Sequence, residues 1–191
     1  MRTLLLHVFC FSVCSAAVFF CGCNLLPEPA ENVTRYFDLG LPAKTLKASG
    51  GSVTVLPFTS SSGERYRMVY RKNNLLCDDD DNKWQMPPGS LITKYLTLIF
   101  SDAGTVRKDG KCQNFLSGNV TAFEADKGDA VLGLRYRIRR ESGSGNADKV
   151  INRSLLLREK IKGDSASDFA SAMGRAAERA AELILRDIDS K

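Results

Sequence analysis

Residues 115–140 read FLSGNVTAFEADKGDAVLGLRYRIRR, and this stretch decides the fold that we expect for the chain. It contains two strand-like runs, at 115–124 and 130–140, which are rich in β-branched, aromatic and other apolar residues. The pair Gly128-Asp129 lies between the runs and is typical of a tight β-hairpin turn. The stretch therefore predicts two antiparallel neighbouring strands.

The second of these runs has two chemically different faces. Between Leu134 and Arg140 there are four arginines, which alternate with Tyr136 and Ile138, so a strand would present arginines on one face. The plain interpretation is a solvated sheet face, and the alternative is a basic surface for phospholipid headgroups or an acidic partner. We prefer the solvated face. Nothing in the chain resembles a nucleic-acid-binding module, so we expect no nucleic acid partner.

The C-terminal part completes this half of the domain. A run at 151–161 predicts a further strand and extends the hairpin to a meander. Gly163-Asp164-Ser165 then begins a helix that is expected to end near Asp187. Its apolar stripe is rich in alanine, which favours close packing on a sheet over a position in a membrane surface. The stripe consists of Phe169, Met173, Ala176, Ala177, Ala180, Leu183, Ile184 and Ile188.

The preceding half of the domain repeats the order of strands and helix. Three strands are expected, at 35–40, 52–58 and 66–71. Residues 73–88 are predicted to form a loop that Trp84 packs onto the domain.

The acidic run of this loop and the helix after it have simple local interpretations. Asp78 to Asp81 lack the spacing of a calcium loop, so we expect solvated acids and no metal site. A helix is expected to follow with Ser90 as its N-cap and to end at Gly104. The resulting fold is α+β, in the order βββ-α-βββ-α, with an antiparallel sheet of about six strands and two helices packed on it.

The N-terminus is typical of a bacterial lipoprotein signal peptide. Arg2 precedes an apolar run from Leu4 to Phe20, and Cys23 is the one cysteine of this region that follows a small residue, Gly22. We therefore expect residues 1–22 to be removed and Cys23 to be lipidated with acyl chains such as palmitate. An ordinary signal peptide and an uncut membrane-spanning helix are the alternatives.

The lipoprotein interpretation also predicts where the protein resides. Residues 23–33 would form the lipidated N-terminus and an extended tether, since they contain Pro27 and Pro29. Asn24 is not the aspartate that retains lipoproteins in the inner membrane of enteric bacteria. We expect a periplasm-facing lipoprotein of the cell envelope, with the outer membrane favoured over the inner.

Composition excludes several kinds of chemistry. The single histidine, His7, lies in the predicted signal, so residues 23–191 offer no histidine for a catalytic triad or a metal site. We expect no enzyme activity, no metal and no cofactor. Cys77 and Cys112 remain as cysteines of an exported domain, and they either pair as a disulfide or are two buried thiols.

Short motifs that occur in order along the chain carry a resemblance. They are Tyr36-Phe37-Asp38-Leu39-Gly40, Val53–Phe58, Met68-Val69-Tyr70-Arg71, Trp84 ahead of the helix with Leu91, Leu96 and Ile99, Gly118–Glu124 leading into Ala130-Val131-Leu132, and the terminal alanine-rich helix. With the cysteine at position 23, this order resembles the ABC-type transport auxiliary lipoproteins of the paraquat-inducible (Pqi) type. The resemblance spans nearly all of residues 34–191, which it marks as a single domain of this kind.

The resemblance implies an accessory function in lipid transport between membranes. Such lipoproteins accompany an MCE-domain substrate-binding protein and its permease and ATPase, which would be the partners here. The chain has no Gly-x-x-x-x-Gly-Lys-Ser/Thr loop, so ATP hydrolysis would belong to a partner. Direct phospholipid binding and a homo-oligomer are left open. The alternative is an envelope lipoprotein that scaffolds an outer-membrane secretion or polysaccharide-export complex.

Overall fold

The structure is a computed structural model, and it describes residues 33–49, 51–61, 65–101, 113–141 and 149–190. Residues Thr34–Lys191 form one compact unit, and they are described here by themselves. The described residues of this unit have an α+β fold, in which two helices, α2 (Pro88–Phe100) and α3 (Ala166–Asp189), accompany one sheet. No helix in these ranges is both long enough and apolar enough to cross a membrane.

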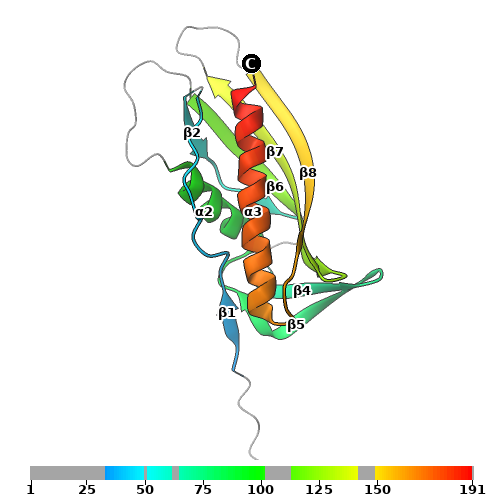
Figure 1. Ribbon diagram of the computed structural model, residues 1–191. Helices are drawn as coiled ribbons and strands as arrows, with labels where there is room; N and C mark the ends of the chain where they lie inside the picture. Colours follow the sequence, from blue (N-terminus) through cyan, green and yellow to red (C-terminus); the bar gives the residue numbers. More distant parts are fainter. Residues whose placement is uncertain (1–32, 50, 62–64, 102–112, 142–148, 191) are drawn as a thin grey trace, which may run out of the picture. The chain divides into compact units, whose positions relative to one another are not determined.

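The expected meander is confirmed. Strands β6 (Gln113–Asp126), β7 (Asp129–Glu141) and β8 (Lys149–Lys160) pair antiparallel along almost their full lengths. The β6–β7 turn consists of Lys127 and Gly128, whose φ angles of 52° and 80° are those of a tight hairpin turn. The meander is the largest part of the sheet, and α3 runs along one of its faces (Figure 1).

The rest of the sheet corrects the expectation of about six purely antiparallel strands. The sheet is mixed and has eight strands among the described residues, in the order β1-β5-β4-β6-β7-β8, with β2 and β3 also beside β6. The additional bounds are β1 Arg35–Phe37, β2 Ser52–Val55, β3 Thr59–Ser60, β4 Arg67–Lys72 and β5 Leu75–Trp84. Pro57 lies between β2 and β3, where it divides the single strand expected at 52–58.

The parallel pairs arise from the length of β6 and the crossover through α2. One edge of β6 pairs with β2 and β3 along residues 113–120 and with β4 at residues 125 and 126, and all three pairings are parallel. Because α2 precedes β6, it supplies the crossover that a parallel arrangement requires. Strand direction depends on this path of the chain, so the local pattern of each strand did not reveal it.

Strand β5 replaces the loop that was expected at 73–88. It forms a hairpin with β4 through a turn at Asn73 and Asn74, where Asn73 has a φ of 57°. The acidic run is accommodated as an irregularity of β5 in which Asp79 accepts hydrogen bonds from the backbone amides of Asp81 and Asn82. Burial opposes ionisation of Asp79, but these bonds and that of the Asn82 side chain outweigh it and lower the pKa of the carboxyl.

Helix α3 forms the centre of the core. Phe169 lies against Tyr70 and against Trp84, which also contacts Phe123 edge-on with ring centroids 5.0 Å apart. Trp84 is fully buried, as expected, although it belongs to a strand. The alanines of the α3 stripe are also fully buried, and their small side chains let the helix approach β7 and β8 closely.

The two helices begin differently. Helix α3 has Ser165 as its N-cap, in a capping box with Asp168, so its predicted start is confirmed. Helix α2 has Pro87 as N-cap and Pro88 at its first position, so the prediction of Ser90 as N-cap was wrong. Proline suits the first helical position because its φ is already helical. A backbone N–H at that position would have no hydrogen-bond partner within the helix, so its absence costs nothing. Gly104, the expected end of α2, lies outside the described residues, and the helix ends at Phe100.

Residues 38–49, which we call the strap, connect β1 to the region of β2 across both helices. The bonds that hold the strap include Lys44 to Glu182 at 2.5 Å, Lys94 to Asp38 at 2.5 Å, the amide of Leu46 to the carbonyl of Ile99 at 2.6 Å, and the amide of Ser49 to Asp189 at 2.9 Å. The expected first strand at 35–40 is shorter for this reason, since the chain leaves the sheet after Phe37.

Candidate functional site

The face of the sheet opposite α3 carries a row of exposed arginines on β7. Arg135, Arg137 and Arg139 are exposed, whereas the alternate residues Leu134, Tyr136 and Ile138 are buried. We call these three residues the arginine row. Their alternation with buried residues confirms the two-faced strand that the sequence predicted.

Arg140 does not belong to this row. Its guanidinium donates to the carbonyl of Ile188 at the end of α3 and to Asn114 at 3.1 Å. A cation at this helix end is favourable because the last carbonyls of a helix carry partial negative charge. Of the four arginines in the run, three face away from the helices and the fourth holds α3 in place.

Two members of the arginine row have no carboxylate within salt-bridge distance in the described part of the chain. Arg139 pairs with Glu141 at 2.8 Å and lies over the ring of Phe115, whereas no such partner is present for Arg135 or Arg137. The residues opposite Arg135 are Asn119 and Ser154. The row is therefore flanked by groups that can donate and accept hydrogen bonds without neutralising the charge.

The other end of the same sheet face is neutralised by ion pairs. Glu124, which is nearly buried, accepts two hydrogen bonds from Arg71, at 2.5 and 3.0 Å, and this contact raises the pKa of the arginine. Arg158 binds Asp126 at 2.9 Å and lies near Asp129. One end of the face is thus an internally satisfied ion network, while the arginine row remains available to an anionic partner.

Apolar and backbone groups extend this candidate surface onto β8. Leu156 and Val150 share the face of the arginine row and are 62% and 40% exposed. Strand β8 pairs with β7 and forms one edge of the sheet in the described chain. Exposed side chains and an edge strand beside a basic row form a surface suited to docking a protein segment.

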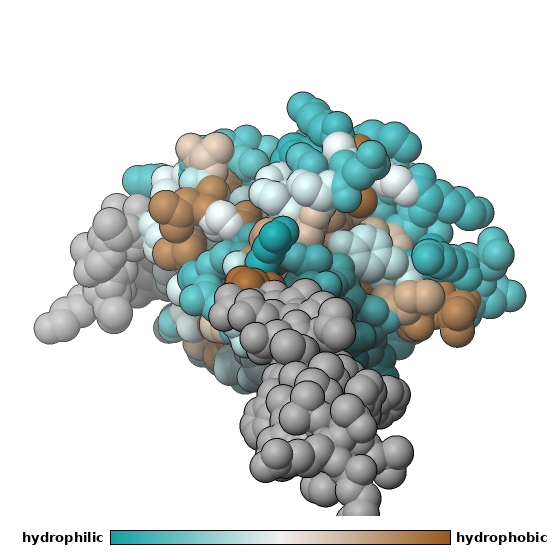
Figure 2. Space-filling model, turned by 90° about the horizontal axis from the view of Figure 1, so that it is seen from below, coloured by the Kyte–Doolittle hydropathy of each residue, from teal (hydrophilic) through white to brown (hydrophobic). Residues whose placement is uncertain are grey.

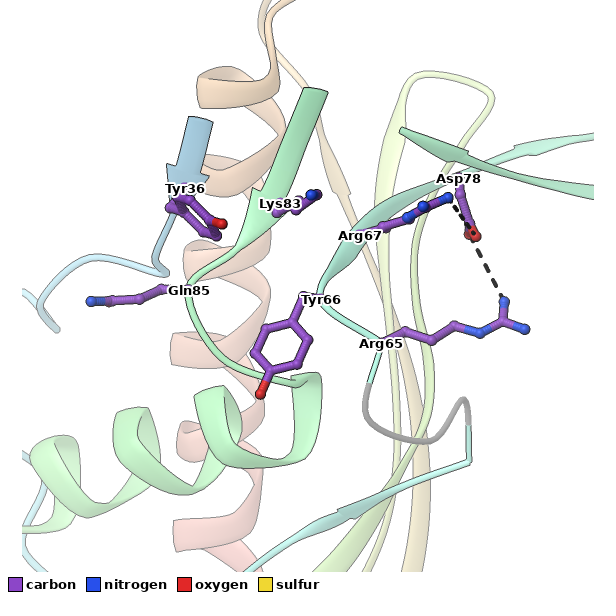
Figure 3. A pocket seen from close by; sticks show the side chains of 7 residues that line it. All are labelled: Tyr36, Arg65, Tyr66, Arg67, Asp78, Lys83 and Gln85. Carbon is purple, nitrogen blue, oxygen red and sulfur yellow. Dashed lines mark ion pairs between the residues drawn. The ribbon is translucent and has the colours of Figure 1, made fainter. Parts of the chain in front are cut away.

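A pocket lies at the other edge of the sheet (Figure 3). It has a volume of about 560 Å³ and is lined by residues of β1, of β5 and of the segment that leads into β4. The lining residues are Tyr36, Arg65, Tyr66, Arg67, Asp78, Lys83 and Gln85. Sequence reasoning missed this site because it assigned residues 73–88 to a loop. The asparagine pair at 73 and 74, a common turn signal, could have indicated the hairpin that brings these residues together.

The described residues offer no metal centre. They contain no group of three or more Cys, His, Asp or Glu side chains that could hold an ion together. Asp78 and Asp80 instead interact with arginines, and Asp79 accepts hydrogen bonds within its own segment. The acidic run thus has a structural explanation.

The predicted cysteine sites are only partly within the described residues. Cys23 lies outside them, so its lipidation stays a prediction. Cys77 is a half-buried free thiol on β5, opposite Tyr70, which in turn is close to the C-terminal end of β6. Cys112 lies outside the described residues. The residue after it, Gln113, is the first of the fourteen residues of β6, whereas Tyr70 lies beside the last residues of that strand. A disulfide between the two positions therefore remains untested.

Comparison with solved structures identifies several similar folds, including two crystal structures of high coverage. One is the crystal structure of an uncharacterized protein, with a TM-score of 0.63 and 16% identity over 82% of this chain and 99% of that one. The other, from Xanthomonas campestris, is described as a DUF330 protein, with a TM-score of 0.60 and 13% identity over 80% and 93% of the two chains. At these identities the likeness concerns the fold. No protein-family model matches the sequence, and no curated protein matches it either.

Proposed function

We propose that this protein is a lipid-anchored accessory component of an MCE/ABC-type intermembrane lipid transport system, of the Pqi-type auxiliary lipoprotein family. It acts by docking a partner and not by catalysis. In this proposal Cys23 carries the acyl chains, and the domain projects into the periplasm, with the outer membrane favoured over the inner. The partners are an MCE-domain protein and its permease and ATPase.

The observation that carries the proposal is the arginine row on the sheet face opposite the helices. Neighbouring arginines of the row are two residues apart on one strand, about 7 Å, so each pair repels by about 0.6 kcal/mol in water. Ion pairs relieve such repulsion at the other end of this face but not at Arg135 and Arg137. A partner with acidic groups would relieve it on binding, and such complementarity increases the association rate and the specificity of docking.

Two further features support an accessory function. The chain has no phosphate-binding loop of the Gly-x-x-x-x-Gly-Lys-Ser/Thr type, so energy from ATP would come from a partner. The fold is similar to that of the DUF330 protein from Xanthomonas campestris, which is compatible with the family resemblance of the sequence.

The proposal is tested by purifying the lipidated protein from membranes and identifying the proteins that accompany it. The informative variant is Arg135→Glu/Arg137→Glu, and the matched control is Lys72→Glu/Lys127→Glu, which changes the charge equally at two exposed positions, the last residue of β4 and the β6–β7 turn. We expect an MCE-domain protein with the wild type and the control but not with the arginine variant. Recovery of secretin or polysaccharide-export proteins instead would contradict the proposal and favour the scaffolding alternative.

The anchor has an independent test. Mass spectrometry of the mature N-terminus should find an acylated Cys23, and Cys23→Ser should move the protein to the soluble fraction. A mature chain that begins elsewhere, or a variant that stays in the membrane, would refute lipidation at this residue.

A further inference from the structure

We propose that the pocket between β1, β4 and β5 binds a phosphate-bearing anion, either a phospholipid headgroup or free phosphate. This site is separate from the arginine row, since it lies at the opposite edge of the sheet. The expected position of the pocket near a membrane rests on the lipid anchor of the proposed function. The charges that would bind a phosphate do not depend on that anchor.

The pocket has the size and the lining of a small-ligand site. Its volume of about 560 Å³ falls in the range of ligand pockets, and its lining combines two tyrosines with charged and amide groups. Figure 3 shows Tyr66 between the side chains of Gln85 and Arg65, and Lys83 near Arg67. These residues come from three segments, so the pocket exists only in the folded domain.

The charges of the pocket favour an anion. Three cationic residues, Arg65, Arg67 and Lys83, line it together with a single carboxylate, Asp78. The guanidinium nitrogens of both arginines lie 3.8 and 3.9 Å from the Asp78 oxygens, which is too long for a hydrogen bond. Asp78 therefore attracts the arginines without occupying their donors.

A second carboxylate reduces this excess of positive charge but does not cancel it. Arg67 also contacts Asp80 at 2.8 Å, and Asp80 is not among the lining residues. Lys83 is within salt-bridge distance of no carboxylate in the described chain. Guanidinium groups bind phosphate through paired N–H donors, and an ammonium group adds a point charge. The pocket therefore offers both guanidinium and ammonium donors to a phosphate.

The position of the pocket along the chain is compatible with a headgroup. Tyr36 lies three residues after Val33, the end of the predicted tether. The ten residues from Asn24 to Val33 span at most about 36 Å, so a chain anchored at Cys23 keeps the pocket within reach of a membrane surface. Tyr36 and Tyr66 are 64% and 45% exposed, and tyrosine is enriched at the level of lipid headgroups.

The surrounding surface is suited to headgroups more than to acyl chains. Seen from the end where β1 and β5 lie, the visible part of the surface is mainly hydrophilic, and hydrophobic residues form small separate groups (Figure 2). A surface of this kind does not insert into hydrocarbon. The ligand is therefore recognised through its phosphate.

The test measures binding of the full mature chain carrying Cys23→Ser to phosphatidylcholine vesicles with and without phosphatidylglycerol. The pocket variant is Arg65→Gln/Lys83→Gln, and the matched control is Lys72→Gln/Lys127→Gln, which removes the same charge at two exposed positions outside both sites. We expect the pocket variant to lose about thirty-fold in affinity for the anionic vesicles, since each basic residue at such a surface contributes a factor of about five. The control should retain most of its affinity.

Calorimetry with soluble ligands distinguishes the two sources of phosphate. Binding of inorganic phosphate to the wild type but not to the pocket variant would assign the site to free phosphate. Binding of glycerol phosphate without inorganic phosphate would assign it to the headgroup. Equal losses in the pocket variant and the control, or no binding of any of these probes, would overturn the proposal.

Failure of this proposal is distinguishable from failure of the proposed function. The pocket variant leaves the arginine row unchanged, so it should still recover an MCE-domain protein from membranes. A pocket variant that binds vesicles like the wild type would refute the phosphate site alone. Loss of the partner from the arginine variant would still support docking through β7.

Discussion

Replacement of Gly174 by alanine sets two effects of known size against each other. Gly174 is buried in α3, where a Cβ atom would lie well inside van der Waals contact with the carbonyl oxygen of Leu39 in the strap. Alanine is the better helix former by about 1 kcal/mol. Overpacking typically costs about 1–3 kcal/mol, and here the opposing atom belongs to the backbone, so no rotamer change can relieve the contact.

The hydrogen bonds of the strap determine which effect is larger. A shift that relieves the contact at Leu39 would strain the backbone bond between Leu46 and Ile99, which contributes about 1 kcal/mol, and would displace the exposed ion pair between Lys44 and Glu182. We therefore expect Gly174→Ala to lower the free energy of unfolding by about 1–2 kcal/mol. For a domain of this size that corresponds to a decrease of about 5 °C in Tm.

The assay is thermal unfolding followed by circular dichroism, with Ser171→Ala as the control. Ser171 is exposed on the same helix, so this substitution should raise Tm slightly through helix propensity alone. A Gly174→Ala protein with a Tm equal to or above that of the wild type would refute the reasoning. It would mean that the strap moves freely over α3.

Three further predictions concern the start of α3 and the cysteines. Ser165→Ala should lower the free energy of unfolding by about 1 kcal/mol, since it removes the N-cap, while Ser167→Ala should change it by less than about 0.5 kcal/mol; equal effects in urea unfolding would refute the cap. Hydrogen bonds from Ser165 lower the pKa of the Asp168 carboxyl in the folded protein. The carboxylate therefore stabilises the fold at pH values above its unfolded pKa of about 4, and this stabilisation is lost as the pH falls through the folded pKa. The difference in the free energy of unfolding between the wild type and Asp168→Asn should therefore vanish in acid. A difference that persists in acid would contradict this role of the carboxylate. Alkylation of the unreduced protein should label Cys77, and a peptide that joins it to Cys112 would show the disulfide instead.

The parts of the fold that the sequence predicted have strong periodic patterns. The alternation in β7 and the apolar stripe of α3 each repeat over many residues, so burial on one face followed directly. Strand β5 lacked such a signal, because aspartate is rare in strands. Its acids are stabilised by contacts that only the folded chain provides, such as the bond between Arg67 and Asp80.

The candidate sites divide in the same way. The arginine row follows from alternation along one strand, so it was visible in the sequence, although only the structure shows that Arg135 and Arg137 have no carboxylate opposite them. The pocket requires β1, β4 and β5 to meet at one edge of the sheet. Parallel pairing of β1 with β5 joins segments almost fifty residues apart, and no local pattern indicates it.

In-cell crosslinking tests the proposal that the β7 face docks a component of a lipid transport system. A photoreactive amino acid would be placed at Arg137, in the arginine row, and as a control at Lys72, at the exposed end of the β4–β5 hairpin. We expect a crosslink from position 137 to an MCE-domain protein and none from position 72. A crosslink from position 137 to a secretin or polysaccharide-export protein, or none at all, would contradict it.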